Sequence, residues 1–236
     1  NYQPGLSSNA DSRKPSHTDD GHIISLYCLQ TADIGGRTLL ASSWAIYNRL
    51  LSTRPDVIQT LKEAWLWDSY EPFPHSSILV LVAHASGSFI PENPSFERPL
   101  LLEEEGKLIC NYRIRPFLGT PGYPRNAAMG PLLKHQEEAL AVVGKIAEEI
   151  CLKFEFKKGD IQFVNNLSLL HAREEFHRAV GENTRRHLLR LVQMDDELGW
   201  KLPAVMKEPM EKMFNHEPDE EKFIWSPEPL PYVIGQ

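Results

Sequence analysis

The spacing of apolar and polar positions along the chain predicts short strands interrupted by a few helices. The clearest helix runs from Pro131 to Ile150, because apolar side chains recur on one side of it at helical spacing and Pro131 suits a first helical position. Two shorter helices are predicted over 41–51 and 56–65 on the same grounds. Several of the other apolar positions alternate with polar ones, and this period of two is typical of strands.

Strand patterns occupy much of the rest of the chain. Leu152, Phe154 and Phe156 alternate with charged residues, and a Lys-Lys-Gly-Asp turn leads into the apolar run 161–164, which predicts a hairpin. Further strands are expected at 22–29, 100–103, 107–114 and 185–194, a turn at 33–36, loops at 1–16 and 116–130, and strand with loops at 66–98. Many short strands with a few helices predict a mixed α/β, mainly β fold: a β-sandwich or jelly roll with helices packed on one face.

Composition and charge narrow the functional classes. The 236 residues are 42% apolar and 24% charged, which is ordinary for a globular protein and excludes wholesale disorder. A net charge of −7 makes nucleic acid a poor partner. The longest apolar run, 78–83, is far shorter than the roughly 20 residues a bilayer requires, and residues 1–20 lack the apolar segment of a signal peptide.

The cysteines indicate a reducing compartment. Cys28, Cys110 and Cys151 are odd in number and widely spaced, which argues against a disulfide framework and against a paired-cysteine metal site. We therefore expect a cytoplasmic protein that binds a small molecule and neither nucleic acid nor membrane. The sequence leaves its oligomeric state undetermined.

The candidate chemistry begins at His17-Thr18-Asp19. In an extended backbone, residues two apart point to the same face about 6.6 Å from each other, so His17 and Asp19 can close on one ion while Thr18 points away. By itself this pattern is also what polar surface residues show. His171, after the strand-like run 161–164, supplies a third candidate ligand. Two histidines and one carboxylate leave three coordination positions open, as in non-haem Fe(II) oxygenases, whereas zinc enzymes use the same residue types with fewer open positions.

Two arginines add an anion-binding signal. In a strand over 185–194, Arg186, Leu188 and Arg190 would share one face. Guanidinium groups on a buried face are costly unless anions pair with them, and arginine is suited to gripping a carboxylate. The alternative is an edge strand whose arginines are solvated.

The polar residues that flank His171 in the sequence have two possible roles. Asn165, Asn166 and Arg173 flank it and could orient the imidazole, or they could satisfy the backbone of a loop. His22 lies on the opposite face of its strand from His17 and is expected to be structural.

Four segments resemble the Fe(II)/2-oxoglutarate-dependent oxygenases of the taurine dioxygenase and clavaminate synthase-like family, most of all its fungal members. They are HTDDGHIISLYCL, TADIGGRTLLAS, KKGDIQFVNNLSLLHAREEF and TRRHLLRLVQ, which together span roughly 15–200. The resemblance implies a double-stranded β-helix, or jelly roll, as an oxygenase domain over 17–200. Residues 1–16 are then a loop or a remnant of an N-terminal region, and 201–236 a C-terminal extension packed on the same domain.

The resemblance also implies roles for individual residues. The positions that match the iron ligands are His17, Asp19 and His171. Thr38 and Arg186 match the residues that hold the distal carboxylate of 2-oxoglutarate, and Arg190 matches a position that binds an acidic group of the substrate in several members. The implied cofactors are Fe(II), 2-oxoglutarate as co-substrate, and O₂.

These observations predict an enzyme that couples oxidative decarboxylation of 2-oxoglutarate, to succinate and CO₂, with hydroxylation or a related C–H oxidation. Its substrate is expected to be a small anionic metabolite, in secondary metabolism. Two alternatives stay open: a non-catalytic jelly-roll protein that binds a small molecule, and a zinc hydrolase. The complete residue set argues against the first, and the second gives no reason for the arginine pair.

Overall fold

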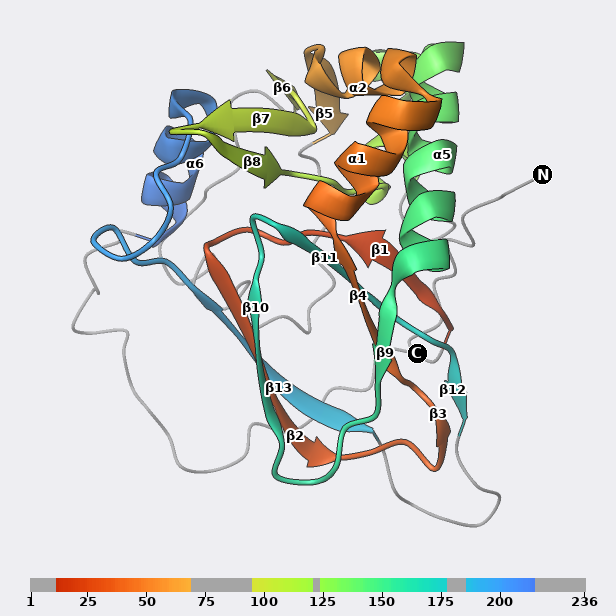
Figure 1. The fold of residues 1–236 in the computed structure, drawn as a ribbon, viewed down its shortest axis with the longest axis vertical. Helices are drawn as coiled ribbons and strands as arrows, with labels where there is room; N and C mark the ends of the chain where they lie inside the picture. The colour runs from red at the N-terminus through yellow and green to blue at the C-terminus, as the bar shows by residue number, and fades with distance from the viewer. Residues whose placement is uncertain (1–11, 69–94, 121–123, 178–185, 215–236) are drawn as a thin grey trace.

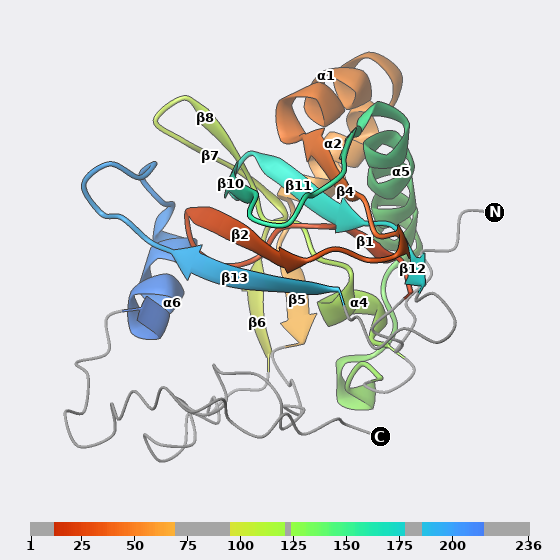
Figure 2. The same cartoon turned by 90° about the horizontal axis from the view of Figure 1, so that it is seen from below.

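Two antiparallel sheets form the centre of the fold (Figure 1). The computed structural model describes residues 12–68, 95–120, 124–177 and 186–214. The four-stranded sheet has the order β1 (Lys14–His17), β11 (Leu169–Arg173), β4 (Thr38–Ser42) and β9 (Leu152–Phe154). The three-stranded sheet has the order β10 (Ile161–Asn165), β2 (Ile23–Gln30) and β13 (His187–Gln193). Seen from below, the two sheets lie on opposite sides of a common interior (Figure 2).

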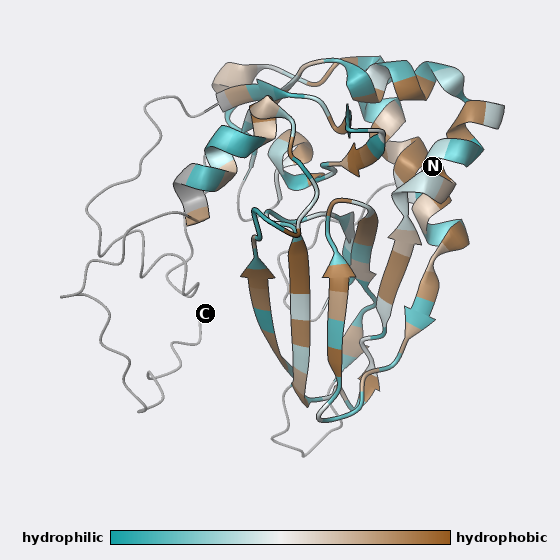
Figure 3. Ribbon diagram, turned by 60° about the vertical axis from the view of Figure 1, so that its left-hand side comes forward, coloured by the Kyte–Doolittle hydropathy of each residue, from teal (hydrophilic) through white to brown (hydrophobic). Residues whose placement is uncertain are grey.

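The strands follow from alternating side chains. In the three-stranded sheet, Ile24 of β2 lies opposite Val164 of β10 and Val192 of β13, and both Ile24 and Val164 are buried. The alternation of hydrophobic and hydrophilic residues along the strands is visible in Figure 3. Because successive side chains point to opposite faces, this pattern directs one set of residues towards the interior.

Three helices lie together beside the four-stranded sheet. They are α1 (Ser43–Thr53), α2 (Pro55–Lys62) and α5 (Lys134–Ile150). The Ser42 hydroxyl accepts a hydrogen bond from the Ala45 N–H and so begins α1 directly after β4. Leu50 and Leu140 of these helices join Leu170 of β11 in the main hydrophobic core. The helix α6 (Ala204–Phe214) lies apart from these three, so not all helices pack on one face.

Smaller elements surround this core. Two antiparallel pairs join β5 (Trp65–Asp68) to β6 (Ser95–Arg98) and β7 (Leu101–Glu104) to β8 (Lys107–Cys110), and a short ladder pairs β3 (Ile34–Gly35) with β12 (Phe176–His177). The remaining helices are α4 (Arg115–Leu118), the 3₁₀ turn η1 (Ala127–Met129) and α6 (Ala204–Phe214). Met206 and Met210 of α6 pack with Ile109 and Leu167 in a second apolar cluster. Among the described helices, none combines the length and hydropathy of a bilayer-spanning helix.

The predicted hairpin over 152–164 is wrong. Leu152–Phe154 pairs with β4 in one sheet, whereas Ile161–Asn165 pairs with β2 in the other. The turn is present, because the Lys157 N–H donates to the Asp160 carboxylate at 2.7 Å. An alternation with a period of two predicts a strand but does not predict which strand it pairs with. Here the turn connects strands of two different sheets and does not close a hairpin.

Other element boundaries shift. The helix expected over 56–65 ends at Lys62, because Trp65 belongs to β5 and donates its indole N–H to the Thr60 carbonyl. The loop expected at 1–16 contains the start of β1 at Lys14, and that at 116–130 contains most of α4 and all of η1. The apolar run 78–83 lies outside the described residues, as does Arg185. The strands and helices expected at 22–29, 41–51, 100–103, 107–114 and 131–150 are confirmed, with ends moved by a few residues.

We predict that Leu140→Ala destabilises the protein by about 2–5 kcal/mol, because Leu140 is 1% exposed and its removal leaves a cavity beneath α5. Leu133, just before the same helix, is 58% exposed, so Leu133→Ala should change the free energy of unfolding by less than about 0.5 kcal/mol. Chemical denaturation of both variants measures the difference. Equal effects would contradict the packing of α5 described above.

Candidate metal centre

The pairing of β1 with β11 brings two histidines face to face. These strands are antiparallel, with His17 directly opposite His171. The imidazole centroids are 4.2 Å apart. Asp19 follows two residues after the end of β1, and its carboxylate turns back towards both rings. The structure therefore brings together the three residues that the sequence singled out as metal ligands.

The three side chains form a compact donor set. One ligand atom from each of His17, Asp19 and His171 lies within 4.8 Å of the others. His17 Nε2 is 3.8 Å from Asp19 Oδ1, and His171 Nε2 is 3.4 Å from Asp19 Oδ2. Two ligand atoms that each lie about 2.1 Å from an ion, at right angles to one another, are about 3 Å apart. The distances between these donor atoms therefore have to shorten only slightly for the three side chains to bind an ion.

Hydrogen bonding prepares His17 for a metal. Its Nδ1 lies 2.8 Å from the Pro15 carbonyl oxygen, to which a protonated Nδ1 donates, leaving a lone pair on Nε2. Two buried ring nitrogens, His17 Nε2 and His171 Nδ1, have no hydrogen-bond partner among the described residues. Buried polar atoms are normally paired, so the free Nε2 of His17, which faces Asp19, is a position that an ion would occupy.

The electrostatics give the protonation states that a metal requires. Burial lowers the pKa of His17 well below its usual range, and the charges of Lys14 and His171 act in the same direction. Burial alone would raise the pKa of Asp19, but a hydrogen bond from His171 and the charges of His17, Lys14 and Arg190 outweigh it and hold that pKa far below its usual value. At neutral pH the site therefore offers a neutral His17 and an ionised Asp19.

Thr18 points away from the two ligands, as the strand geometry predicted. Its hydroxyl accepts from the Tyr112 N–H at 2.9 Å, and its own N–H donates to the Tyr112 carbonyl at 2.7 Å. The Tyr112 hydroxyl in turn donates to the Leu140 carbonyl of α5. Sequence reasoning missed Tyr112 and Pro15, because both act on the site through backbone atoms and no side-chain pattern marks a backbone acceptor.

Arg186 lies close to the segment that carries Thr38. Thr38 is buried at the start of β4, opposite Arg173 of β11. Arg186 packs against Gly36, where an added Cβ would come within 3.2 Å of the Arg186 Nε, and its guanidinium lies 5.6 Å from the Phe176 ring centroid. Burial lowers the pKa of Arg186, and within the described part of the chain it has no carboxylate partner.

Of the two arginines, only Arg190 lies within β13. Arg186 precedes β13, which begins at His187, and the pairing with β2 shifts by one residue between His187 and Leu188. The strand expected over 185–194 therefore begins one residue after Arg186, and the extra residue at the register shift, Leu29, belongs to β2. Arg190 does lie within β13, and its Nη1 donates to Asp19 Oδ2 at 2.7 Å. Its side chain is 48% exposed.

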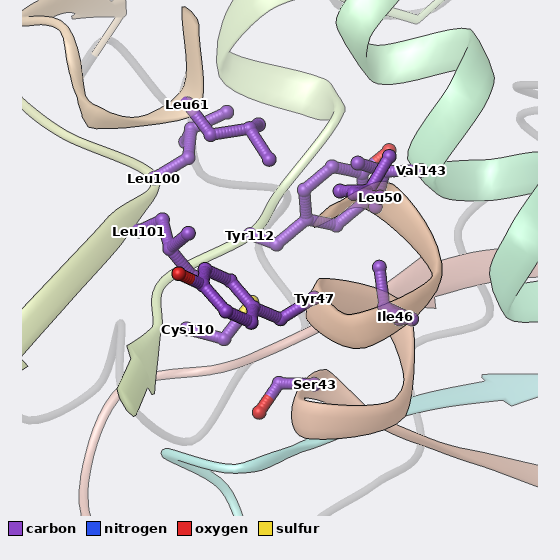
Figure 4. A pocket seen from close by; sticks show the side chains of 10 residues that line it. All are labelled: Ser43, Ile46, Tyr47, Leu50, Leu61, Leu100, Leu101, Cys110, Tyr112 and Val143. Atoms are coloured by element: carbon purple, nitrogen blue, oxygen red, sulfur yellow. The ribbon is translucent and has the colours of Figure 1, made fainter. Parts of the chain in front are cut away.

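A separate cavity lies in the main core. It has a volume of about 20 Å³ and is lined mainly by apolar side chains around α1, with Ser43 at one end (Figure 4). That volume holds about one water molecule. None of the predicted site residues lines it, so this cavity is a packing defect of the core and not a substrate site.

A His-Asp-His cluster is the ligand set with which non-haem Fe(II) oxygenases bind their metal, although zinc enzymes use the same residue types. The family model described as "Taurine catabolism dioxygenase TauD, TfdA family" matches residues 1–192. The chain belongs to this family.

Two curated relatives support the assignment. Taurine hydroxylase-like protein SAT17 of Stachybotrys chartarum is 72% identical over 228 residues, which cover 97% of this chain and 54% of the relative. FR-33289 synthase of Streptomyces rubellomurinus is 26% identical over 185 residues, covering 75% of this chain and 48% of the relative. The chain thus spans about half the length of the curated relatives it matches.

Solved structures show the same fold. Asparagine oxygenase in complex with Fe(II), 3-hydroxyasparagine and succinate superposes with a TM-score of 0.54 at 16% identity, covering 79% of this chain and 53% of that one. PvcB from Pseudomonas aeruginosa superposes with a TM-score of 0.50 at 18% identity, covering 84% and 62%. The fold class is therefore mixed α/β, mostly strands, as in iron oxygenases.

We predict that His171→Ala weakens binding of Fe(II) by at least about 100-fold, because loss of one of three ligands is more severe than the 10- to 100-fold typical of losing a supporting residue. Anaerobic titration with Fe(II) measures the affinity. The matched control is His177→Ala, since His177 is exposed and pairs with Glu175 at the surface. A folded His171→Ala protein with the affinity of the wild type would exclude this histidine as a ligand.

Proposed function

We propose that this protein is a non-haem Fe(II) oxygenase that couples the oxidative decarboxylation of 2-oxoglutarate, to succinate and CO₂, with hydroxylation or a related C–H oxidation of a small anionic metabolite. The observation that carries this proposal is the His17–Asp19–His171 cluster, and a partly buried Arg186 without a carboxylate partner among the described residues supports it. Membership of a dioxygenase family supports the reaction class. The name of one relative, FR-33289 synthase, supports a role in secondary metabolism.

The fold supports the same proposal. The two facing antiparallel sheets, with four and three strands, are interpreted as the halves of a double-stranded β-helix, or jelly roll. In this interpretation the ligands lie at the interior end of the four-stranded sheet. Arg190 reaches them from the other sheet.

Each residue of the site has a part in this proposal. His17, Asp19 and His171 hold the iron, which together with 2-oxoglutarate and O₂ supplies the oxidising chemistry when bound. The Arg186 guanidinium pairs with the distal carboxylate of 2-oxoglutarate, and the Thr38 hydroxyl donates to the same group. A zinc hydrolase, which the ligand types alone allow, has no use for Arg186.

We predict that 2-oxoglutarate added anaerobically to the Fe(II)-loaded protein produces a weak visible charge-transfer band, and that Arg186→Ala weakens this binding roughly 10- to 150-fold. That range corresponds to loss of a charge-assisted hydrogen bond worth about 1.5–3 kcal/mol. The Fe(II) affinity of the variant should be unchanged, because Arg186 is not a ligand. Arg49→Ala is the matched control, since Arg49 is half exposed and pairs with Glu149 on the surface.

The same titration decides between the alternatives. Absence of the band and of succinate formation in a folded, iron-loaded protein would contradict the oxygenase and leave a binding protein. A normal 2-oxoglutarate affinity in Arg186→Ala would mean that another residue anchors the co-substrate.

Arg190 is proposed to meet an anionic group of the primary substrate. One of its nitrogens bonds to Asp19, while its exposed side chain carries further N–H donors. Arg190→Ala is expected to raise the concentration of substrate needed for succinate formation, tested with a panel of small carboxylates and sulfonates that includes taurine. The anaerobic 2-oxoglutarate affinity should stay within about twofold of wild type, because Arg186 is intact.

Two results would overturn this role. If 2-oxoglutarate affinity falls as far as in Arg186→Ala, both arginines hold the co-substrate. If neither constant changes while the melting temperature falls, Arg190 serves only to pair with Asp19.

A further inference from the structure

We propose that Asn166 is a positioning residue that aims the Asp19 carboxylate at the metal. The inference rests on the proposed iron site. The Asn166 side chain is 1% exposed and makes four hydrogen bonds to the backbone of residues 19–21. Its Oδ1 accepts from the Asp19 N–H at 2.8 Å, and its Nδ2 donates to the carbonyls of Asp19, Asp20 and Gly21 at 2.8, 3.2 and 2.9 Å.

These bonds replace a missing strand ladder. β1 ends at His17 and β2 begins at Ile23, so Asp19 lies in the connection between them. The connection turns sharply at Gly21, whose φ is +81° and whose added Cβ would lie 2.8 Å from Val192. A ligand in such a turn needs its backbone fixed by other means, and a buried carboxamide with both donor and acceptor does this.

Two ion pairs are made by the same turn. Arg190 bonds to the Asp19 carboxylate from the three-stranded sheet, whereas Arg113 pairs with Asp20 at 2.5 Å. Because Asn166 holds the peptide groups on both sides of Asp19, the carboxylate keeps its direction towards the two histidines.

Asn166 also links Asp19 to His171. It lies five residues before His171, in the connection between β10 and β11, and its own N–H donates to the His22 carbonyl at 2.9 Å. One short segment thus carries the second histidine and fixes the backbone of the carboxylate. This assigns Asn166 to Asp19 rather than to the imidazole that it flanks in the sequence.

The neighbouring asparagine provides a matched control. Asn165 Oδ1 accepts one local hydrogen bond, from the Leu167 N–H at 3.1 Å, as is usual in a turn. Within the described part of the chain, its side chain makes no hydrogen bond to residues 19–21. Asn165→Ala should therefore leave the metal site as it is.

The experiment uses Co(II) alone as the probe, added to the whole chain without 2-oxoglutarate, because its ligand-field absorption reports the number and geometry of its ligands. Asn166→Asp keeps the shape and the Oδ1 acceptor but turns a second oxygen towards three carbonyls. We expect it to bind Co(II) about 10- to 100-fold more weakly than wild type, with an altered spectrum. Asn165→Ala should match the wild type in affinity and spectrum.

Melting temperatures of the metal-free proteins separate positioning from folding. If Asn166→Asp does not fold, Asn166→Ala, which adds no charge, takes its place in the same comparison. A variant of Asn166 with wild-type affinity and spectrum overturns the proposal, as does one whose melting temperature falls while the spectrum of its bound Co(II) is unchanged. Failure of the wild type itself to bind Co(II) would instead overturn the iron site, and this inference with it.

Discussion

The antiparallel pairing of β1 with β11 is the contact on which the rest of the site depends. It places His17 opposite His171, and no local feature of either segment could do so. β11 lies between β1 and β4, so the strand that carries His171 is hydrogen-bonded along both edges. β4 runs directly into α1, and α1 and α5 share the main core with Leu170 of β11. The packing of the helices therefore fixes the ligand-bearing strands.

The second requirement is control of charge. Asp19 is one carboxylate among several cations: Arg190 bonds to it directly and Lys14 contributes at longer range. The nearby Arg113 is paired with Asp20. This arrangement keeps Asp19 ionised in a largely buried place, where a metal ion needs a charged ligand.

The secondary structure was largely predictable, and its pairing was not. Period and turn signals located the long helix, the central strands and the turn at Lys157–Asp160, because these depend on neighbouring residues. The partner of β9 depends on the whole fold, and the expected hairpin with β10 is replaced by pairing in two different sheets. The start of β13 was likewise not predicted, since the strand begins at His187, one residue after Arg186.

The sequence by itself determined which residues could bind a metal and which could bind an anion. The two-residue spacing of His17 and Asp19 and the chemistry of imidazole and carboxylate are local properties, and the family pattern extends them to His171. Only the tertiary structure decided how these groups are held. Hydrogen bonds between side chains and backbone groups do this: His17 to the Pro15 carbonyl, Thr18 to the Tyr112 N–H, and Asn166 to the backbone of residues 19–21. Every residue offers the same backbone groups, so their partners are set by which segments the folded sheets bring together.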